Sequence, residues 1–252
     1  MHQLQEALGL GHLSLYPELE HALCTLASPN KVCSLGIYGG SFNPPHKAHV
    51  ELARQLSAQG CLDYILVVPA LRSPFKEYDV LPEAQKRFEL CLRAFADMPR
   101  VFVSEIELRR NSISYTFDTL NEISTALPCG VNLKLILGSD AFESFDSWKH
   151  SDGIRSLAQL LVVKRDAGRN YLEAQEYTAS QRNLNQAILK QVDWDKKTQW
   201  CLLDLPCISS TELRLLLAKR DDNESRGKDI LHRYLPAAVL EYIQEHKLYL
   251  NN

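Results

Sequence analysis

The sequence predicts an α/β protein built on a Rossmann-like, doubly wound and mainly parallel sheet with helices on both faces. Short apolar runs of β type alternate along the chain with segments of helical periodicity, a pattern typical of such sheets. Several of these runs are continuously apolar, as expected of parallel strands that are covered on both faces. Ligands of such sheets bind beyond the carboxyl ends of the strands, where we therefore expect the functional residues.

Apolar runs and helical periods locate the strands and helices of the main domain. The predicted strands are Val32–Tyr38, Tyr64–Pro69, Val101–Leu108, Leu133–Gly138, Leu160–Lys164 and Gln199–Leu205. The predicted helices are Val50–Gln59, Pro82–Phe95, Tyr115–Thr125, Leu172–Lys190, Ser210–Lys219 and Pro236–Glu245. A glycine closes the first helix, and the last opens with a proline at a position that suits a first helical turn.

The N-terminal part of the chain stands apart from this alternation. Pro17–Ala27 carries three leucines at helical spacing, which predicts a short helix packed on the main domain. We therefore divide the chain into an N-terminal extension, residues 1–31, and a main domain, residues 32–250. Residues 220–229 are charged and polar without apolar content, which predicts a loop.

The composition describes a globular protein without a general basic field. The 252 residues include 28 basic and 31 acidic ones, a formal net charge of −3, so we expect no nucleic acid partner and only local anion sites. No apolar run approaches the roughly 18 residues of a membrane helix, and the N-terminus lacks a secretory signal pattern. The seven cysteines form no Cys-x-x-Cys pair, which favours reduced thiols in the cytoplasm over disulfides or a zinc site. The composition leaves open whether the chain forms homo-oligomers.

The turn after the first predicted strand carries the strongest functional signal. It reads Gly39-Gly40-Ser41-Phe42-Asn43-Pro44-Pro45-His46-Lys47-Ala48-His49. The glycines let the backbone bend and bring its N–H groups against a ligand, and the prolines stiffen the turn. His46 and His49 are three residues apart, so a helix start would place both on one face at its positive end, where phosphates bind. The alternative is an ordinary strand–turn–helix connection with incidental histidines.

A second signal is the run Ile208-Ser209-Ser210-Thr211-Glu212-Leu213-Arg214. Hydroxyl side chains at a helix start can cap its first N–H groups, and the same groups can hold a phosphate. Arg214 lies one turn inside the predicted helix and can reach an anion at that end bidentately. Taken alone, the run also fits a capped amphipathic helix with a solvated arginine.

Both runs, in this order, resemble signatures of the nucleotidyltransferase superfamily. Gly40–His49 is similar to Gly-x-Phe-x-Pro-x-His-x-x-His, and Ile208–Arg214 is similar to Ile-Ser-x-Thr-x-x-Arg. Members transfer AMP or CMP from a nucleoside triphosphate to an acceptor that bears a phosphate. The second histidine is usually preceded by glycine in this family, and here Ala48 adds one methyl group at that position.

Three further matches resemble the nicotinate (or nicotinamide) mononucleotide adenylyltransferases. Asn111–Leu120 is similar to their Ser-Tyr-Thr segment, which holds the pyridine mononucleotide. Leu137–Asp140 with Trp148 is similar to their Gly-x-Asp … Trp segment, and Tyr234–Tyr249 to their closing helix and final aromatic residue. The resemblance covers roughly residues 33–250, so it implies that the main domain is a nucleotidyltransferase domain.

The resemblance implies a role for each site residue. The catalytic residues would be His46, His49 and Arg214. ATP would be bound by Gly39, Gly40, Ser41, Phe42, His46, His49, Gly138, Asp140, Ser209, Thr211 and Arg214. The acceptor, nicotinate mononucleotide, would be bound by Lys76, Ser114, Tyr115, Thr116 and Trp148. Its phosphate would attack the α-phosphorus of ATP directly, and Mg²⁺ would arrive on the triphosphate rather than at a protein metal site.

Alternatives remain at several of these positions. Trp148 also fits a core tryptophan, and Asp140 also fits a helix cap. In the loop after the second predicted strand, the family often has a histidine directly before a lysine. This chain has Phe75 before Lys76 at that position. A transferase with a nicotinamide mononucleotide or phosphopantetheine acceptor, or a non-catalytic nucleotide sensor on the same fold, would share the first two signatures.

Overall fold

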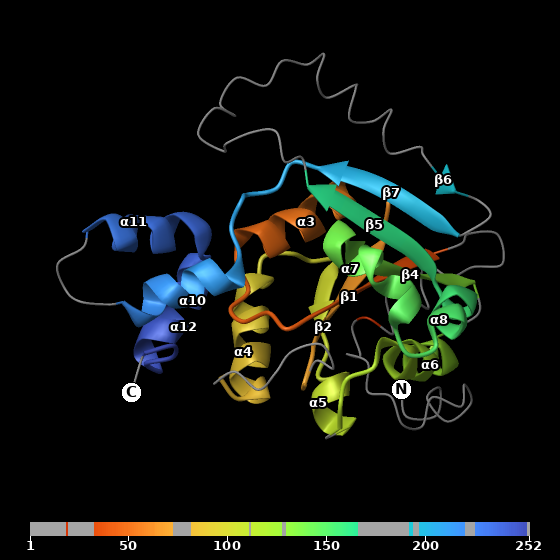
Figure 1. The fold of residues 1–252 in the computed structure, drawn as a ribbon, viewed down its shortest axis with the longest axis horizontal. Helices are drawn as coiled ribbons and strands as arrows, with labels where there is room; N and C mark the ends of the chain where they lie inside the picture. Colours follow the sequence, from red (N-terminus) through yellow and green to blue (C-terminus); the bar gives the residue numbers. More distant parts are fainter. Residues whose placement is uncertain are drawn as a thin grey trace, which may run out of the picture.

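A seven-stranded sheet forms the centre of the molecule, with helices packed on both of its faces (Figure 1). The computed structural model describes residues 19, 33–72, 82–110, 112–127, 130–165, 192–193, 197–219 and 225–250. The strands are β1 (Cys33–Gly40), β2 (Tyr64–Pro69), β3 (Val101–Val103), β4 (Val131–Gly138), β5 (Gln159–Arg165), β6 (Val192–Asp193) and β7 (Thr198–Leu203).

The strand order is β3-β2-β1-β4-β5-β7-β6, so the chain starts in the middle of the sheet and builds outward on both sides. All neighbouring strands are parallel except β6 and β7, which are antiparallel. The prediction of a doubly wound, mainly parallel sheet is therefore confirmed. Because β1, β2, β4 and β5 are parallel, their carboxyl ends meet at one edge, with Gly40 beside Pro69 and Gly138 beside Val163.

The helices of the described residues are more numerous than predicted. They are α3 (Lys47–Ala58), α4 (Ala84–Ala94), α5 (Ile106–Arg110), α6 (Thr116–Ala126), α7 (Ser139–Glu143), a 3₁₀ turn η1 (Phe145–Ser147), α8 (Ser151–Leu157), α10 (Ser210–Ala218), α11 (Ser225–Tyr234) and α12 (Ala237–Glu245). The predicted helices at 172–190 and 17–27 lie outside the described residues, apart from Leu19. The division of the chain at residue 31 stays a prediction.

Five of the six predicted strands end within two residues of the observed ones, and the strand predicted at Val101–Leu108 is wrong beyond Val103. Ser104 ends β3 because its side-chain oxygen accepts the N–H of Ile106 at 3.3 Å, which turns the chain into α5. The segment from Ile106 to Leu108 is apolar at both ends, so its composition fits a strand as well as one helical turn.

Two further boundaries differ from the prediction. Helix α3 begins at Lys47, three residues before the predicted start at Val50, with His46 as its N-cap and His49 in its first turn. The loop predicted at 220–229 gives way to α11 from Ser225. The exposed residues Lys228 and Asp229 make the first part of this helix look like a polar loop in the sequence. Its apolar face is seen only further along, where Leu231 is buried in the core.

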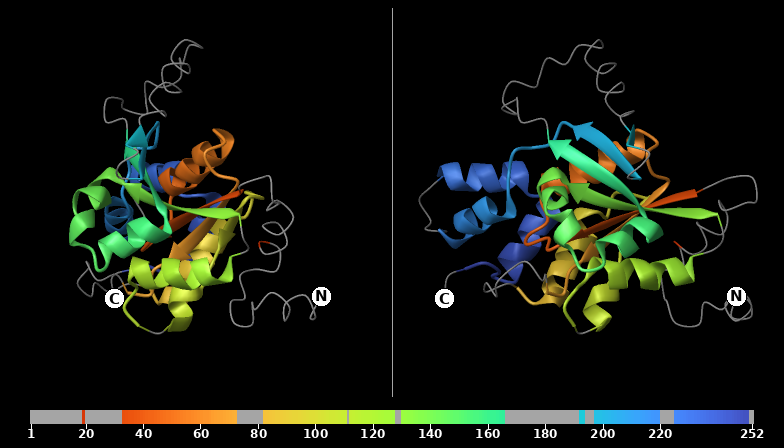
Figure 2. Two further views of the ribbon diagram at one scale, coloured as in Figure 1. Left: turned by 90° about the vertical axis from the view of Figure 1, so that its right-hand side faces the viewer. Right: turned by 45° about the vertical axis from the view of Figure 1, so that its right-hand side comes forward.

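Two hydrophobic cores lie on opposite faces of the sheet. One core joins the sheet to α3, α4 and the C-terminal helices α10, α11 and α12. The other joins it to α5, α6, η1 and α8, and it includes Leu19, which is fully buried. Figure 2 shows the C-terminal helices, in blue, grouped at one end of the molecule. Because helices cover both faces of the sheet, the loops at the carboxyl ends of its strands are where a binding site can form.

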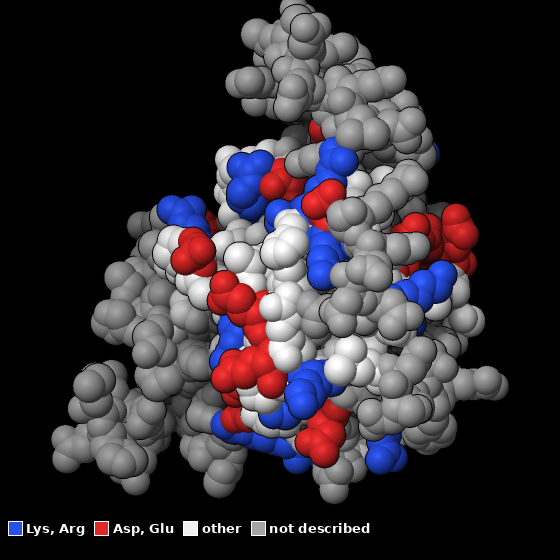
Figure 3. Space-filling model, turned by 90° about the vertical axis from the view of Figure 1, so that its left-hand side faces the viewer, with Lys and Arg blue, Asp and Glu red and all other residues white. Residues whose placement is uncertain are grey.

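The surface at the end of the molecule that includes the C-terminal helices carries mixed charge. Figure 3 shows Lys and Arg interspersed there with Asp and Glu, so no broad field of one sign covers this face. Among the described residues, no helix is long and apolar enough to cross a membrane. No disulfide bond joins the five described cysteines.

Candidate active site

A cavity of about 500 Å³ opens at the carboxyl ends of β1, β2 and β4. Its wall contains predicted site residues from three segments that are distant in the sequence: Gly39, Gly40, Ser41, Ser114, Tyr115, Thr116 and Trp148. The first three are predicted to bind ATP and the other four to bind the acceptor. The fold therefore brings the start of the predicted ATP turn and most of the predicted acceptor residues to one cavity. The other described residues that are predicted to bind ATP do not line it: Phe42, His46, His49, Gly138, Asp140, Ser209, Thr211 and Arg214.

The turn that follows β1 is held in an unusual backbone conformation. Phe42 has a φ of 44°, in the left-handed region that a bulky residue rarely adopts. Its ring is 2 % exposed and packs edge-on against Tyr38, His49 and Phe95 at centroid distances of 5.3, 5.1 and 6.4 Å. A Cβ on Gly40 would lie 3.1 Å from the Phe42 ring, so glycine leaves room for that ring. Packing thus compensates the strain and fixes the turn without a ligand.

The two histidines lie at the start of α3 with their rings in contact and tilted by 34°. Their ring centroids are 3.8 Å apart, and the backbone N–H of His46 donates to Nδ1 of His49 at 3.1 Å. Because Nδ1 accepts this hydrogen bond, the neutral His49 ring carries its hydrogen on Nε2. His49 therefore presents Nε2–H as a donor, at the helix end that carries positive partial charge.

The N-terminus of α10 is attached to the same turn from the other end of the chain. Arg214 Nη1 donates to the Asn43 carbonyl at 3.0 Å, across 171 residues of sequence, and Nη2 donates to Thr211 Oγ1 at 3.2 Å. Ser210 Oγ donates to the Pro44 carbonyl at 3.0 Å. These bonds place the second predicted signature directly beside the first.

Ser209 caps α10 through a reciprocal pair of hydrogen bonds. Its Oγ accepts the Glu212 N–H at 3.2 Å, and its own N–H donates to a Glu212 carboxylate oxygen at 2.8 Å. The capped-helix reading of this run is therefore correct as a description of the local structure. Since the N–H and the Oγ of Ser209 both bond to Glu212, phosphate binding at this helix end stays a prediction.

On the acceptor side, Ser114 ties the second loop to the start of α6. Its N–H donates to the Arg72 carbonyl at 2.9 Å, and its Oγ accepts the N–H of Leu71 at 3.0 Å. Tyr115 follows at the N-cap of α6 and lines the cavity. Lys76 and Phe75 lie outside the described residues. The contacts of Ser114 nevertheless fix where the loop after β2 begins.

Trp148 is half-buried; it lines the cavity and also packs against the hydrophobic core on this face of the sheet. Its ring lies 5.5 Å from that of Phe145, and its Nε1 donates to Ser144 Oγ at 3.4 Å. The neighbouring Lys149 places Nζ 4.1 Å from the centre of the Tyr115 ring and lines the same cavity. Sequence reasoning missed Lys149, although its position next to Trp148 was a usable signal.

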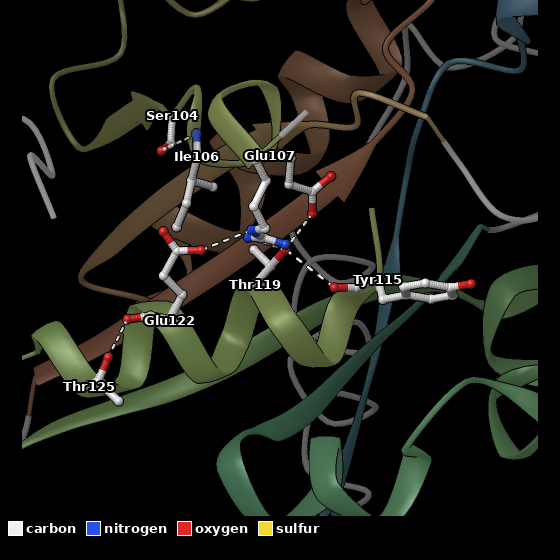
Figure 4. A network of polar contacts seen from close by, with 8 residues as sticks. Ser104, Ile106, Glu107, Tyr115, Thr119, Glu122 and Thr125 are labelled. Atoms are coloured by element: carbon white, nitrogen blue, oxygen red, sulfur yellow. Dashed lines mark hydrogen bonds and ion pairs between the residues drawn. The ribbon is translucent and has the colours of Figure 1, made fainter. Parts of the chain in front are cut away.

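Glu107 on α5 is a second residue of the wall that sequence reasoning missed. It is 7 % exposed, and Thr119 Oγ1 of α6 donates to its carboxylate at 2.6 Å (Figure 4). Arg110 donates to the same Thr119 oxygen and to the Glu122 carboxylate, at 3.1 and 2.9 Å. Burial raises the pKa of Glu107, while hydrogen bonds from Thr119 and Ser114 act in the opposite direction. Sequence reasoning placed Glu107 inside a strand and gave it no role.

Asp140 and Gly138 lie at the end of β4, outside the lining of the cavity. Gly138 is the N-cap of α7, and Asp140 lies in its first turn. Both are exposed, and Ser139 Oγ lies 3.4 Å from a carboxylate oxygen of Asp140. The structure therefore leaves this carboxylate accessible at the carboxyl edge, next to the cavity-lining Leu137.

The fold and site together define a class of protein. A parallel α/β sheet carries a glycine turn, a helix start with two histidines and an arginine from a distant helix at one edge, as in nucleotidyltransferases. A family model described as cytidylyltransferase-like matches residues 37–216. Within this class, the chain belongs to the nicotinate-nucleotide adenylyltransferase family.

Two relatives carry that family assignment. A Coxiella burnetii protein named probable nicotinate-nucleotide adenylyltransferase is 34% identical over 221 residues, which cover 85% of this chain and 97% of the relative. A Thermus thermophilus protein of the same name is 35% identical over 217 residues, which cover 85% of this chain and 98% of the relative.

A solved structure has the same fold. Plasmodium falciparum nicotinic acid mononucleotide adenylyltransferase, complexed with NaAD, superimposes with a TM-score of 0.62 at 21% sequence identity. The match covers 86% of this chain and 97% of that one. At this level of identity the likeness concerns the fold.

Proposed function

We propose that this protein transfers the adenylyl group of ATP to nicotinate mononucleotide, forming nicotinate adenine dinucleotide and pyrophosphate. The observation that carries this proposal is the single cavity that both the Gly39–Ser41 turn and the Ser114–Thr116 segment line. The names of the relatives support the same reaction.

The triphosphate of ATP would lie across the turn after β1 and the start of α3. The backbone N–H groups of that turn, the Nε2–H of His49 and the side chain of Arg214 are donors suited to phosphoryl oxygens. His46 would contribute from the position beside His49, where the two rings are in contact. Gly138 would allow close approach at the end of β4, and Asp140 would accept hydrogen bonds from the ribose hydroxyls.

The chemistry would need alignment more than proton transfer. The phosphate of the acceptor is already ionised near neutral pH, so it can attack the α-phosphorus in line and expel pyrophosphate without a covalent enzyme intermediate. Negative charge grows on the phosphoryl oxygens during this step. Donors held in place before the reaction, above all His49 and Arg214, would stabilise that charge at little reorganisation cost.

The pyridine ring of the acceptor would stack on Trp148 beside Tyr115, with Ser114 and Thr116 supplying polar groups around it. We propose that the acid form is preferred over the amide because Lys149, and Lys76 from the second loop, add positive charge near the ring. Glu107 carries negative charge when ionised, so the ring carboxylate would point away from it, toward the Tyr115 and Lys149 side.

Magnesium would be bound mainly by the triphosphate. The described residues contain no group of three or more His, Cys, Asp or Glu side chains that could hold a metal ion. Mg²⁺ in nucleotide sites commonly keeps several waters and takes its remaining ligands from phosphates. When bound there, it would neutralise charge on the phosphates, and the residues of the chain would orient the complex. A cytoplasmic location and the oligomeric state stay predictions.

The proposal is tested by a balance of products. The purified protein is incubated with Mg-ATP and, in separate reactions, nicotinate mononucleotide, nicotinamide mononucleotide or phosphopantetheine. We expect nicotinate adenine dinucleotide and pyrophosphate in equal amounts from the first reaction. Dinucleotide from the amide alone, or dephospho-coenzyme A from phosphopantetheine alone, would identify a different transferase. Binding of ATP without product from any acceptor would favour the nucleotide sensor.

A further inference from the structure

The largest fully buried side chain of the described residues is a charged one, Arg87 on α4. It is 2 % exposed, and no carboxylate of the described residues forms an ion pair with it. Its Nε is buried and has no hydrogen-bond partner in that part of the chain. Burial lowers the pKa of Arg87, with Tyr249, Cys91 and Glu107 acting in the opposite direction. A cation in such a place costs stability, so a reason for its presence must lie in what it binds.

The two terminal nitrogens of Arg87 bind the two substrate loops. Nη1 donates to the Ser41 carbonyl at 2.8 Å, in the turn predicted to hold ATP. Nη2 donates to the Leu71 carbonyl at 3.0 Å, in the loop after β2. The N–H of Leu71 in turn donates to Ser114 Oγ, so this loop is joined directly to the acceptor segment. One planar guanidinium therefore spans both half sites.

These two bonds also determine where backbone N–H groups point. In a planar trans peptide, the carbonyl of one residue and the N–H of the next point in opposite directions. Holding the Ser41 carbonyl toward α4 turns the Phe42 N–H away from α4, and holding the Leu71 carbonyl does the same for the Arg72 N–H. Both bonds also keep a carbonyl oxygen from facing an anionic ligand, which it would repel.

We propose that Arg87 is a positioning residue. It holds the turn that contains Ser41 (the ATP turn) and the loop after β2 that contains Leu71 (the acceptor loop) at a fixed distance and orientation to each other. The two loops leave adjacent parallel strands, with Gly40 beside Pro69, and the Ala70 N–H donates to the Gly40 carbonyl at 2.8 Å, so Arg87 adds its two bonds just beyond the point where strand pairing ends. In-line transfer depends on the distance and angle between attacking oxygen and α-phosphorus, and a 1 Å misplacement can cost about 10² in rate. Arg87 sets that alignment without contact to the reacting atoms.

This inference rests on the proposed function, and three variants test it. Arg87→Lys keeps the charge but replaces the rigid fork by a single ammonium group that cannot reproduce its geometry. Arg87→Met keeps much of the length and removes the charge and both donors. Arg93→Met is the matched control, because Arg93 lies on the same helix, bonds to Glu89 and contacts the Tyr242 ring rather than either loop.

Each variant is assayed for kcat and for both KM values, at a temperature well below its own thermal midpoint. We expect Arg87→Met to lower kcat by about 10², Arg87→Lys to lose less, and Arg93→Met to match the unmodified protein. If Arg87→Met does not fold, Arg87→Lys carries the test. A folded Arg87 variant with unchanged kcat, or a loss confined to the KM of one substrate, would overturn the proposal.

A second readout does not depend on turnover. Hydrogen exchange of the amides at 41–42 and at 71–72, measured on the ligand-free protein, should rise together in either folded Arg87 variant and stay unchanged in Arg93→Met. Unchanged exchange at either loop would contradict a shared anchor. If the unmodified protein makes no dinucleotide, the proposed function fails, while these exchange rates still decide the role of Arg87.

Discussion

At the residue scale, one hydrogen bond decides which ring nitrogen of His49 carries the hydrogen. Its Nδ1 accepts the N–H of His46, which directs the hydrogen of the neutral ring to Nε2. The tilted His46 ring and the edge-on Phe42 ring hold the imidazole in place. A donor fixed in this way can stabilise developing charge without moving.

Replacing His49 by alanine should therefore abolish most turnover while leaving the fold intact. Loss of one donor of this kind typically lowers kcat by ~10²–10³, roughly 2.7–4 kcal/mol. The comparison is His232→Ala, because the His232 side chain is exposed on α11, and within the described part of the chain it is the backbone carbonyl of His232 that accepts a hydrogen bond from Lys47 Nζ. Steady-state kinetics of both proteins decide the point. A kcat for His49→Ala close to that of the control would remove the histidine from the mechanism.

Trp148 gives a second prediction at this scale. Trp148→Ala should raise the KM for the pyridine mononucleotide by about 5- to 150-fold, from a stacking loss of ~1–3 kcal/mol, with little change in the KM for ATP. Trp200→Ala serves as control, since Trp200 packs against Phe142 and does not line the cavity. Equal changes in both KM values would mean that Trp148 stabilises the fold and does not stack on the pyridine ring of the acceptor.

At the element scale, α5 and α6 are joined by a buried polar network under the acceptor side of the cavity. Glu107 of α5 accepts from Thr119 of α6, and Arg110 connects Thr119 to Glu122 (Figure 4). Because Thr119 lies in α6, its bond to Glu107 fixes α6 against α5. The stability of these two helices should then depend on the charge of Glu107.

The sign of that dependence follows from the raised pKa of Glu107. An unfolded glutamate ionises near pH 4.3, so the native state holds the proton more tightly than the unfolded chain does. Stability of the unmodified protein, relative to Glu107→Gln, should therefore fall as pH rises from about 4 through the raised pKa, and level off above it. Thermal midpoints of both proteins from pH 4 to 8 measure this. If the thermal midpoint of the unmodified protein instead rises relative to that of Glu107→Gln as the pH rises, the hydroxyl and arginine partners of Glu107 lower its pKa by more than burial raises it.

Helix α10 provides the other prediction at this scale. Arg214 joins the helix start to the Asn43 carbonyl of the ATP turn, and its removal should lower kcat/KM for ATP by ~10²–10³. Arg214→Met is compared with Lys219→Met, which removes an exposed cation from the other end of the same helix. If kcat/KM for ATP falls no more in Arg214→Met than in Lys219→Met, Arg214 does not bind the triphosphate and its role is limited to the hydrogen bond with the Asn43 carbonyl.

At the scale of the whole molecule, the sequence predicted the sheet well because parallel buried strands are continuously apolar. It also predicted the turn at Gly39–His49 and the helix start at Ser209, where local residue types determine local conformation. It missed α8 and placed α5 in a strand, because helices of five to seven residues contain too few turns to show a period.

The charged residues of the site were harder to predict than its signatures. Arg87 appears in the sequence as one polar residue in an amphipathic helix, yet it lies 46 residues from Ser41 and bonds to it. Glu107 and Lys149 likewise enter the cavity wall through contacts between distant elements. Burial of a charge is a property of tertiary packing, and no local pattern encodes it.

The central claim is that one cavity aligns ATP with the acid form of the pyridine mononucleotide. The most direct test is kcat/KM for nicotinate mononucleotide and for nicotinamide mononucleotide, each measured with saturating Mg-ATP. We expect dinucleotide from both, with the higher value for the acid, because the cationic Lys149 lies in the cavity wall beside Tyr115. Equal values, a higher value for the amide, or no dinucleotide from either acceptor would contradict this account of the site.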